Sequence, residues 1–147
     1  MTEIVTVTTN PAVDLSTSVE KISPTLKFRG TSQQRHPGGG GINTARVIKR
    51  LGGEVCAIYP AGGAMGILLR ELLDREGITS QSLAIKEETR EDFFVSETST
   101  RNQYRFILPG PRLKEGEWQE CLRLVSSIEL FPGFIVASGS LAGRDAG

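Results

Sequence analysis

The residues with the clearest capacity for chemistry are four consecutive glycines, Gly38 to Gly41, followed closely by Asn43. Glycine has no Cβ, so its backbone can approach a ligand closely and can adopt positive φ. Apolar residues then recur at helical spacing from Ile42 to Leu51, which predicts a helix that starts at the glycines. The free N–H groups and the dipole of a helix N-terminus favour anionic or oxygen-rich ligands. We therefore predict a ligand-binding loop here; a flexible loop before a helix is the simpler alternative.

The type of glycine loop narrows the choice of ligand. A phosphate-binding P-loop ends in Gly-Lys-Ser/Thr, and Gly41-Ile42-Asn43 does not match that pattern. A dinucleotide fingerprint needs a third spaced glycine, and Asn43 stands in that place. The asparagine amide both donates and accepts hydrogen bonds. Sugar hydroxyls are therefore the ligand groups that the loop indicates.

Strands and helices alternate along most of the chain. Residue patterns predict strands over 3–9, 54–59, 79–86 and 131–137, with the second and the last of these buried. They predict helices over 42–51, 65–76 and 115–128. Such alternation is typical of a parallel sheet with helices on its faces, which is an α/β fold.

Two further pairs of β-prone segments interrupt this order. They cover 15–22 with 26–34, joined by a turn at 23–25, and 89–96 with 103–108. Threonine, serine and glutamine fill most of their positions, and large apolar residues are few. Such strands cannot all lie inside a packed sheet, so we expect them to form a small exposed flap.

Polar residues follow two of the predicted strands directly. Asp14 comes shortly after the first, and Ser138-Gly139-Ser140 comes after the last. Open α/β sheets bind ligands beyond the carboxyl ends of their strands, and serine-rich turns can line an oxygen-rich ligand. Solvated turns remain the alternative for both segments.

Composition limits the classes of partner and location. The 147 residues suffice for one domain, and 17 basic residues balance 17 acidic ones, which favours neither nucleic acid nor a membrane surface as partner. The N-terminus lacks a signal peptide pattern, and no window reaches the ~18 apolar residues of a spanning helix. Cys56 and Cys121 fit regular elements, so we expect reduced, buried thiols and a cytoplasmic protein. A catalytic thiol would have only His36 to serve it.

Six segments together resemble the PfkB-type sugar kinases of the ribokinase superfamily. They are Thr9–Asp14, Pro37–Arg46, Leu51–Gly53, Pro60–Gly63, Gln103–Phe106 and Ser138–Leu141, in the order and spacing of that family. Within the family, the sequence is most similar to the bacterial minor-type 6-phosphofructokinases.

The resemblance implies a ribokinase-like α/β fold with a mostly parallel sheet and a small β-sheet lid. The core would comprise about 1–14, 36–88 and 109–147, and the lid about 15–35 and 89–108. In the family, two lids pair to form a homodimer. Family chains are about twice this length, so the chain would be truncated after about half of the fold.

The resemblance also implies roles for single residues. Asp14 would accept hydrogen bonds from sugar hydroxyls, and Asn43 would bind the sugar. The backbone of Gly39, Gly40 and Gly41 would lie against it. A phosphate already present on the substrate would contact Arg90 and Ser140, and Lys27 is a possible further phosphate contact.

The family reaction transfers the γ-phosphoryl group of ATP, with Mg²⁺, to a sugar hydroxyl. The resemblance indicates fructose 6-phosphate as substrate and fructose 1,6-bisphosphate as product, in glycolysis. The family's catalytic aspartate lies in a Gly-Ala-Gly-Asp motif that these 147 residues lack, as they lack the adenine-binding segment. We therefore expect the sugar-binding half of an enzyme, inactive alone, with neither ATP nor Mg²⁺ assigned to residues here.

Other functions remain open at this point. The chain could be a non-catalytic half that binds sugar or dimerises. It could also belong to a kinase for fructose 1-phosphate, tagatose 6-phosphate or an unphosphorylated sugar. Glu91 and Asp92 directly follow Arg90, and two acids would repel a phosphate unless they face away from it. Leu141 is followed by Ala142-Gly143 where the phosphofructokinase branch has Pro-Pro-Gly.

Overall fold

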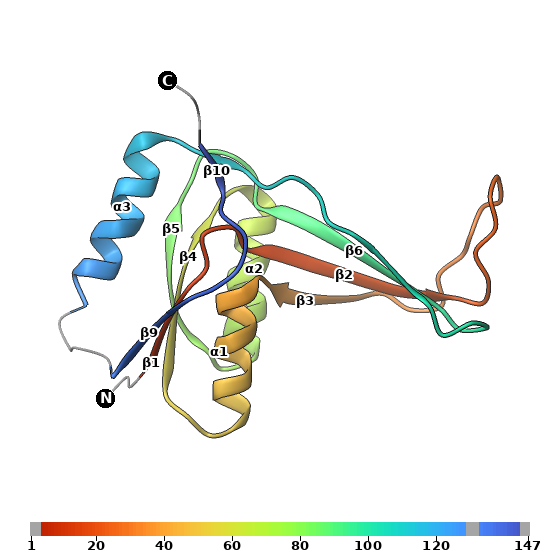
Figure 1. Ribbon diagram of the computed structural model, residues 1–147, viewed down its shortest axis with the longest axis horizontal. Helices are drawn as coiled ribbons and strands as arrows, with labels where there is room; N and C mark the ends of the chain where they lie inside the picture. Colours follow the sequence, from red (N-terminus) through yellow and green to blue (C-terminus); the bar gives the residue numbers. More distant parts are fainter. Residues whose placement is uncertain (1–3, 129–132, 145–147) are drawn as a thin grey trace.

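A computed structural model describes residues 4–128 and 133–144. It shows a body of helices packed on a sheet, from which a second sheet projects as a long arm (Figure 1). The elements are β1 Ile4–Val7, β2 Ala12–Val19, β3 Gln34–Gly38, α1 Gly40–Arg50, β4 Val55–Ala61, α2 Gly63–Arg75, β5 Thr79–Ala84, β6 Arg90–Glu97, β7 Gln103–Phe106, β8 Arg112–Leu113, α3 Glu115–Ser126, β9 Phe134–Ala137 and β10 Gly143–Arg144.

The body is built on a parallel sheet in the order β5-β4-β1-β9. Strand β4 is buried at every position, and its side chains alternate between the two faces. Val55, Ala57 and Tyr59 pack with α1 and α2, whereas Cys56 and Ile58 pack under α3. Helices therefore cover both faces of the sheet, which confirms the α/β prediction and the buried strand predicted at 54–59.

The two cysteine thiols are free and buried, and burial raises the pKa of both. They fill apolar space, as the sequence predicted. None of the helices in the described ranges is long and apolar enough to cross a membrane.

Strand β9 corrects the prediction of a buried strand over 131–137. Residues 131 and 132 lie outside the described residues, and β9 is an edge strand that pairs with β1 alone. Phe134 is 69% exposed and Ile135 is 53% exposed. Their apolar character was read correctly, but the described residues supply no strand to cover that edge.

An exposed apolar edge strand favours pairing between chains. We therefore expect the purified chain to form species larger than one chain in light scattering. Ile135→Lys should lower the average mass, because a charge on the edge opposes strand pairing. Leu122→Lys, which removes an equally exposed leucine from α3, is the matched control and should leave the mass unchanged. A parent chain that is already a monodisperse monomer would contradict the prediction.

The projecting sheet has the order β3-β2-β6-β7 and carries both interrupting segments of the sequence. The hairpin of β6 and β7 confirms the strand pair predicted at 89–96 and 103–108. We refer to this sheet, together with the loops at its far end, as the lid.

The strand predicted over 26–34 is wrong. The antiparallel partner of β2 is β3, which begins only at Gln34 and pairs Asp14 with His36 and Val13 with Pro37. Residues 20–33 instead form the loop at the far end of the lid (Figure 1). Polar β-prone composition alone did not distinguish strand from loop. Pro37 and Gly38 are tolerated in β3 because it is an edge strand.

One carboxylate fastens the far loop to the lid sheet. Glu97, at the end of β6, accepts hydrogen bonds from the Ile22 N–H and from the Thr100 hydroxyl. These bonds hold the pKa of Glu97 below its ordinary value. The short parallel pair β8 and β10, which sequence patterns did not predict, joins the segment after the lid to the segment after β9.

Candidate functional site

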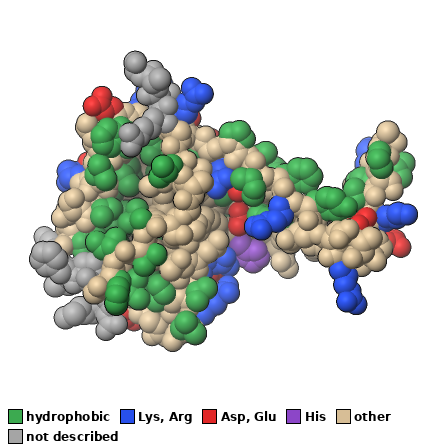
Figure 2. All heavy atoms as spheres, viewed as in Figure 1, with side chains coloured by type: hydrophobic (Ala, Val, Ile, Leu, Met, Phe, Trp, Pro, Cys, Tyr) green, Lys and Arg blue, Asp and Glu red, His purple; other side chains and the backbone are tan. Residues whose placement is uncertain are grey.

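The polar face of the lid turns toward the start of α1. Alternation along the strands places Asp14 and Ser16 of β2, Arg90, Asp92 and Phe94 of β6, and Gln103 and Arg105 of β7 on this face. Five of these residues line a hollow of about 340 Å³, to which His36 and Arg46 also contribute. The five are Asp14, Ser16, Phe94, Gln103 and Arg105. Figure 2 shows the imidazole at the junction between body and lid, beside acidic and basic side chains.

Asp14 is the central titratable group of this hollow. Burial, and secondarily the neighbouring Asp92 carboxylate, raise its pKa from the ordinary 3.8 to about 6, although the guanidinium groups of Arg90, Arg105 and Arg46 oppose the shift. The carboxylate is thus ionised near pH 7 in a partly desolvated place. It is suited to accept hydrogen bonds from hydroxyl groups.

The four glycines lie where other parts of the protein pack closely against the backbone. Gly38 belongs to β3, Gly39 caps α1 with φ 115°, and Gly40 and Gly41 form the first turn of α1, two residues earlier than predicted. A Cβ on Gly38 would lie 2.5 Å from the Asp14 carboxylate oxygens, and one on Gly40 would lie 2.6 Å from Gly139 N. The glycines therefore bring the helix start against β1, β2 and the segment after β9.

Arg90 forms a second polar corner next to Asp14. It donates from Nη2 to the Asn10 carbonyl (3.2 Å) and from Nη1 to the Leu108 carbonyl (3.3 Å), and its side chain is only 10% exposed. Asn10 in turn donates from Nδ2 to Ser140 Oγ (3.0 Å). The buried Arg90 Nε has no protein acceptor among the described residues. A network of hydrogen bonds therefore links Arg90, Asn10 and Ser140 and holds the guanidinium close to Asp14.

The two acids after Arg90 have different environments. Asp92 lies on the Arg90 side of the strand, 3.3 Å from Arg90 Nη1, and accepts a hydrogen bond from the Leu108 N–H. Glu91 points to the opposite face, where it lies 3.5 Å from Arg35. Of these two acids, only Asp92 lies close enough to Arg90 to offset its charge.

The Arg90–Asp92 pair should stabilise the lid. Asp92→Asn would leave a nearly buried guanidinium without its counter-charge, so we expect the free energy of unfolding to fall by about 2 kcal/mol in urea titrations. Glu91→Gln is the matched control on the opposite face, where the ion pair with Arg35 is longer and less buried, and we expect a change below about 1 kcal/mol. Equal losses in both variants would contradict a specific role for the buried pair.

The structure does not bring every predicted site residue to one place. Asp14, Gly39, Gly40, Gly41, Arg90 and Ser140 gather where β1, β2, β6, α1 and the segment after β9 meet. Asn43 is exposed in the first turn of α1, beside this group. Lys27 lies in the far loop of the lid, where it lines a separate hollow with Lys21, Phe28 and Arg29.

Sequence reasoning missed several residues that line the hollow, namely Ser16, His36, Arg46, Phe94, Gln103 and Arg105. The Arg105 guanidinium carbon lies 4.8 Å from the centroid of the Phe94 ring, so a cation–π contact fixes its position. The period of two along β2 and β7 was a usable signal, since it puts Ser16 with Asp14 and Gln103 with Arg105. No group of three His, Cys, Asp or Glu side chains in the described ranges could hold a metal ion.

The family model that matches residues 1–138 is that of the pfkB family carbohydrate kinases. A curated relative from Mycobacterium tuberculosis, ATP-dependent 6-phosphofructokinase isozyme 2, is 46% identical over 138 residues, which are 94% of this chain and 41% of the relative. The chain thus spans less than half the length of that relative.

Solved structures agree with this match. Phosphofructokinase-2 from Escherichia coli in complex with fructose-6-phosphate superposes with a TM-score of 0.90 at 41% identity, over 97% of this chain and 46% of that one. A tetrameric inhibited form of the same E. coli protein gives a TM-score of 0.91 at 40% identity, over 98% and 47%. The fold is therefore a ribokinase-like α/β fold. The chain belongs to the pfkB family of carbohydrate kinases.

Proposed function

We propose that this chain is the substrate-binding part of an ATP-dependent kinase that phosphorylates fructose 6-phosphate to fructose 1,6-bisphosphate. The observation that supports the proposal is the guanidinium of Arg90, held by the Asn10 and Leu108 carbonyls next to the ionised Asp14 carboxylate. A phosphate and several hydroxyls on one small molecule would satisfy both groups. The names of the Mycobacterium and Escherichia relatives supply the particular sugar.

In this proposal each predicted residue keeps a distinct role. Asp14 accepts hydrogen bonds from the sugar hydroxyls. Asn43 and the backbone of Gly39 to Gly41 form the side of the sugar site that lies against α1. Arg90 and Ser140 hold the phosphate. Arg105 from β7 adds a second cation opposite α1, held in place by Phe94. Lys27 would reach a phosphate only from another copy of the chain, because it lies at the far end of the lid.

ATP and Mg²⁺ would complete the reaction, and we assign neither to residues of this chain. The glycine run lacks the Lys-Ser/Thr of a P-loop. We assign nucleotide, metal and the catalytic base to sequence outside these 147 residues, so the chain alone should not turn over.

Calorimetry on the 147-residue chain tests the proposal. Fructose 6-phosphate should bind, whereas fructose should bind at least about 10-fold more weakly because it lacks the phosphate. Arg90→Ala should abolish this difference, and Arg70→Ala, on the exposed side of α2, should preserve it. Equal binding of both sugars would overturn the choice of a phosphosugar. Release of ADP from ATP by this chain, lost in Asp14→Ala, would overturn the statement that it is inactive alone.

We also propose that two lids pair to form a homodimer. The lid face opposite the polar one carries Leu15, Phe93, Val95, Tyr104 and Phe106. Phe106 is 54% exposed and Tyr104 is 38% exposed. A second lid packed on this face would cover these apolar side chains. Phe106→Asp in the Ile135→Lys background should give a monomer in light scattering, and an unchanged dimer would count against lid pairing.

A further inference from the structure

A second hollow, of about 290 Å³, lies on the other side of Arg46 from the sugar site, between α1 and the end of α2. Its lining comprises His36, Arg46, Lys49, Arg50 and Glu76. Three cations and an imidazole thus face one carboxylate, in a chain whose formal charges balance overall. We infer that this basic hollow binds a small, multiply charged phosphate anion beside the sugar site, with which it shares His36 and Arg46 in its lining.

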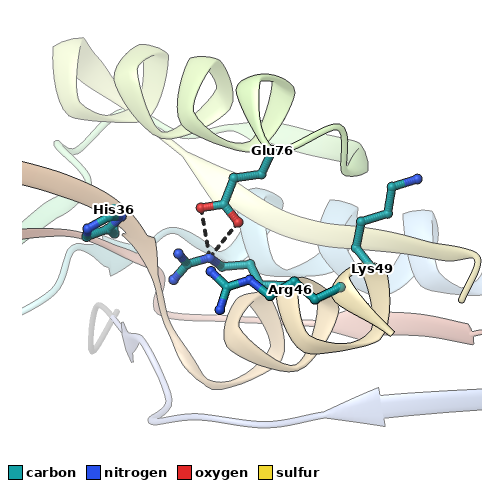
Figure 3. Close-up of a pocket in the computed structure, with 5 residues that line it drawn as sticks. His36, Arg46, Lys49 and Glu76 are labelled. Atoms are coloured by element: carbon teal, nitrogen blue, oxygen red, sulfur yellow. Dashed lines mark hydrogen bonds and ion pairs between the residues drawn. The ribbon is translucent and has the colours of Figure 1, made fainter. Parts of the chain in front are cut away.

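The one carboxylate of the hollow is already fully engaged. Glu76, just after α2, accepts two hydrogen bonds from Arg46 Nε, at 2.7 and 3.0 Å (Figure 3). Arg46 also donates from Nη1 to the Pro37 carbonyl (3.2 Å). These three bonds hold the guanidinium in a fixed orientation, because both helices and β3 contribute to them. Nη2 of Arg46 has no acceptor within the described part of the chain.

The remaining cations have no carboxylate partner among the described residues. Lys49 and Arg50 are exposed in the last turn of α1. His36 and Lys49 lie on opposite sides of the Arg46–Glu76 pair, so groups that can donate hydrogen bonds border the hollow from β3 to the end of α1 (Figure 3). Cations in a last helical turn are also stabilised by the helix dipole. That interaction accounts for Lys49 and Arg50, but not for the convergence of Arg46 and His36 on the same hollow.

Size and charge set the class of ligand. With one of the three cations neutralised by Glu76, the hollow keeps a formal charge of about +2, which favours an anion with two or more negative charges, such as pyrophosphate. Guanidinium and ammonium groups on a rigid frame bind phosphate oxygens through charge-assisted hydrogen bonds.

Titration of pyrophosphate into the 147-residue chain at low salt tests the inference by calorimetry. We expect one saturable site, and at least a 10-fold weaker Kd in Lys49→Ala/Arg50→Ala. Arg70→Ala/Arg75→Ala removes two exposed cations from α2 at equal cost in net charge, and should change the Kd less than about 2-fold. All four residues are exposed, so circular dichroism should show every variant folded as the parent is.

Three results would overturn the inference. One is the absence of saturable pyrophosphate binding. Another is equal weakening in both double variants, which would mean a response to net charge alone. The last is stoichiometric displacement of pyrophosphate by fructose 6-phosphate, which would make the hollow part of the sugar site. Undiminished pyrophosphate binding with fructose 6-phosphate present would support two separate sites, and failure of fructose 6-phosphate to bind would affect only the proposed function.

Discussion

Asp14→Asn should weaken binding of fructose 6-phosphate about 100-fold at pH 7.5 and should stabilise the folded chain at the same time. The loss of affinity follows because a carboxylate that accepts hydroxyl hydrogen bonds contributes about 2–3 kcal/mol, and the amide oxygen accepts more weakly. The gain in stability follows because burial opposes the ionised form of Asp14. Binding is measured by calorimetry and stability by urea unfolding.

The pH dependence of the two effects has a definite sign. In the folded chain the pKa of Asp14 is about 6, above the ordinary value of 3.8. Between these values the folded state holds a proton that the unfolded state has lost, so this group's contribution to the free energy of unfolding falls as pH rises. The stability advantage of Asp14→Asn should therefore be small near pH 4, grow toward pH 6 and stay constant above it. Its size should be about 1 kcal/mol, since solvent screens a group that is only partly buried.

Affinity for the sugar should also depend on the titration of Asp14, but it should rise with pH. In the parent chain, fructose 6-phosphate binding should weaken as pH falls through about 6, because the carboxylate becomes protonated. Asp74→Asn, on the exposed side of α2, is the control and should alter neither the binding nor the pH profile. An Asp14→Asn variant that is less stable than its parent at pH 7.5 would refute the account of a desolvated carboxylate.

Local patterns predicted the body of the fold well because each pattern there has one physical cause. A continuous apolar run such as β4 has to be covered by other elements on both faces, which indicates a central strand. The apolar residues of α2 recur at helical spacing and have to be covered on one side only, so both elements follow from the residues alone. The register of β3 on β2 has no such local cause. It depends on pairing across the lid, which places His36 opposite Asp14 and leaves the residues before Gln34 as a loop.

The sequence supplied candidate site residues but not their surroundings. Asp14 drew attention by its place shortly after the first predicted strand, whereas Arg90 was assigned only by the resemblance to the sugar kinases. That Asp92 pairs with Arg90 while Glu91 faces away follows from strand alternation, once the strand is known to begin at Arg90. Arg46 could not be found this way, because its orientation depends on Glu76, thirty residues further along the chain.

Gly41→Ala should lower the free energy of unfolding by about 3 kcal/mol, although alanine is the better helix former. The added Cβ would lie 2.5 Å from both the Val7 carbonyl oxygen and Thr8 Oγ1. The Val7 oxygen cannot give way easily, since it accepts a hydrogen bond from Ser138 N, and Gly41 N donates to Ser138 O. The start of α1 would have to move away from β1, which should also abolish binding of fructose 6-phosphate. Urea unfolding and calorimetry on the same sample measure both losses.

Gly116→Ala is the matched control, because Gly116 is also a glycine in the first turn of a helix, α3. No atom lies within 4 Å of a Cβ added there, so the substitution should stabilise the chain by about 0.5–1 kcal/mol through helix propensity. The two variants thus make the same chemical change with opposite expected signs. If Gly41→Ala unfolded at the same urea concentration as its parent, crowding against β1 would not explain the glycine. Close approach of a ligand would then be the remaining reason for glycine at that position, and the loss of sugar binding would have to occur without any loss of stability.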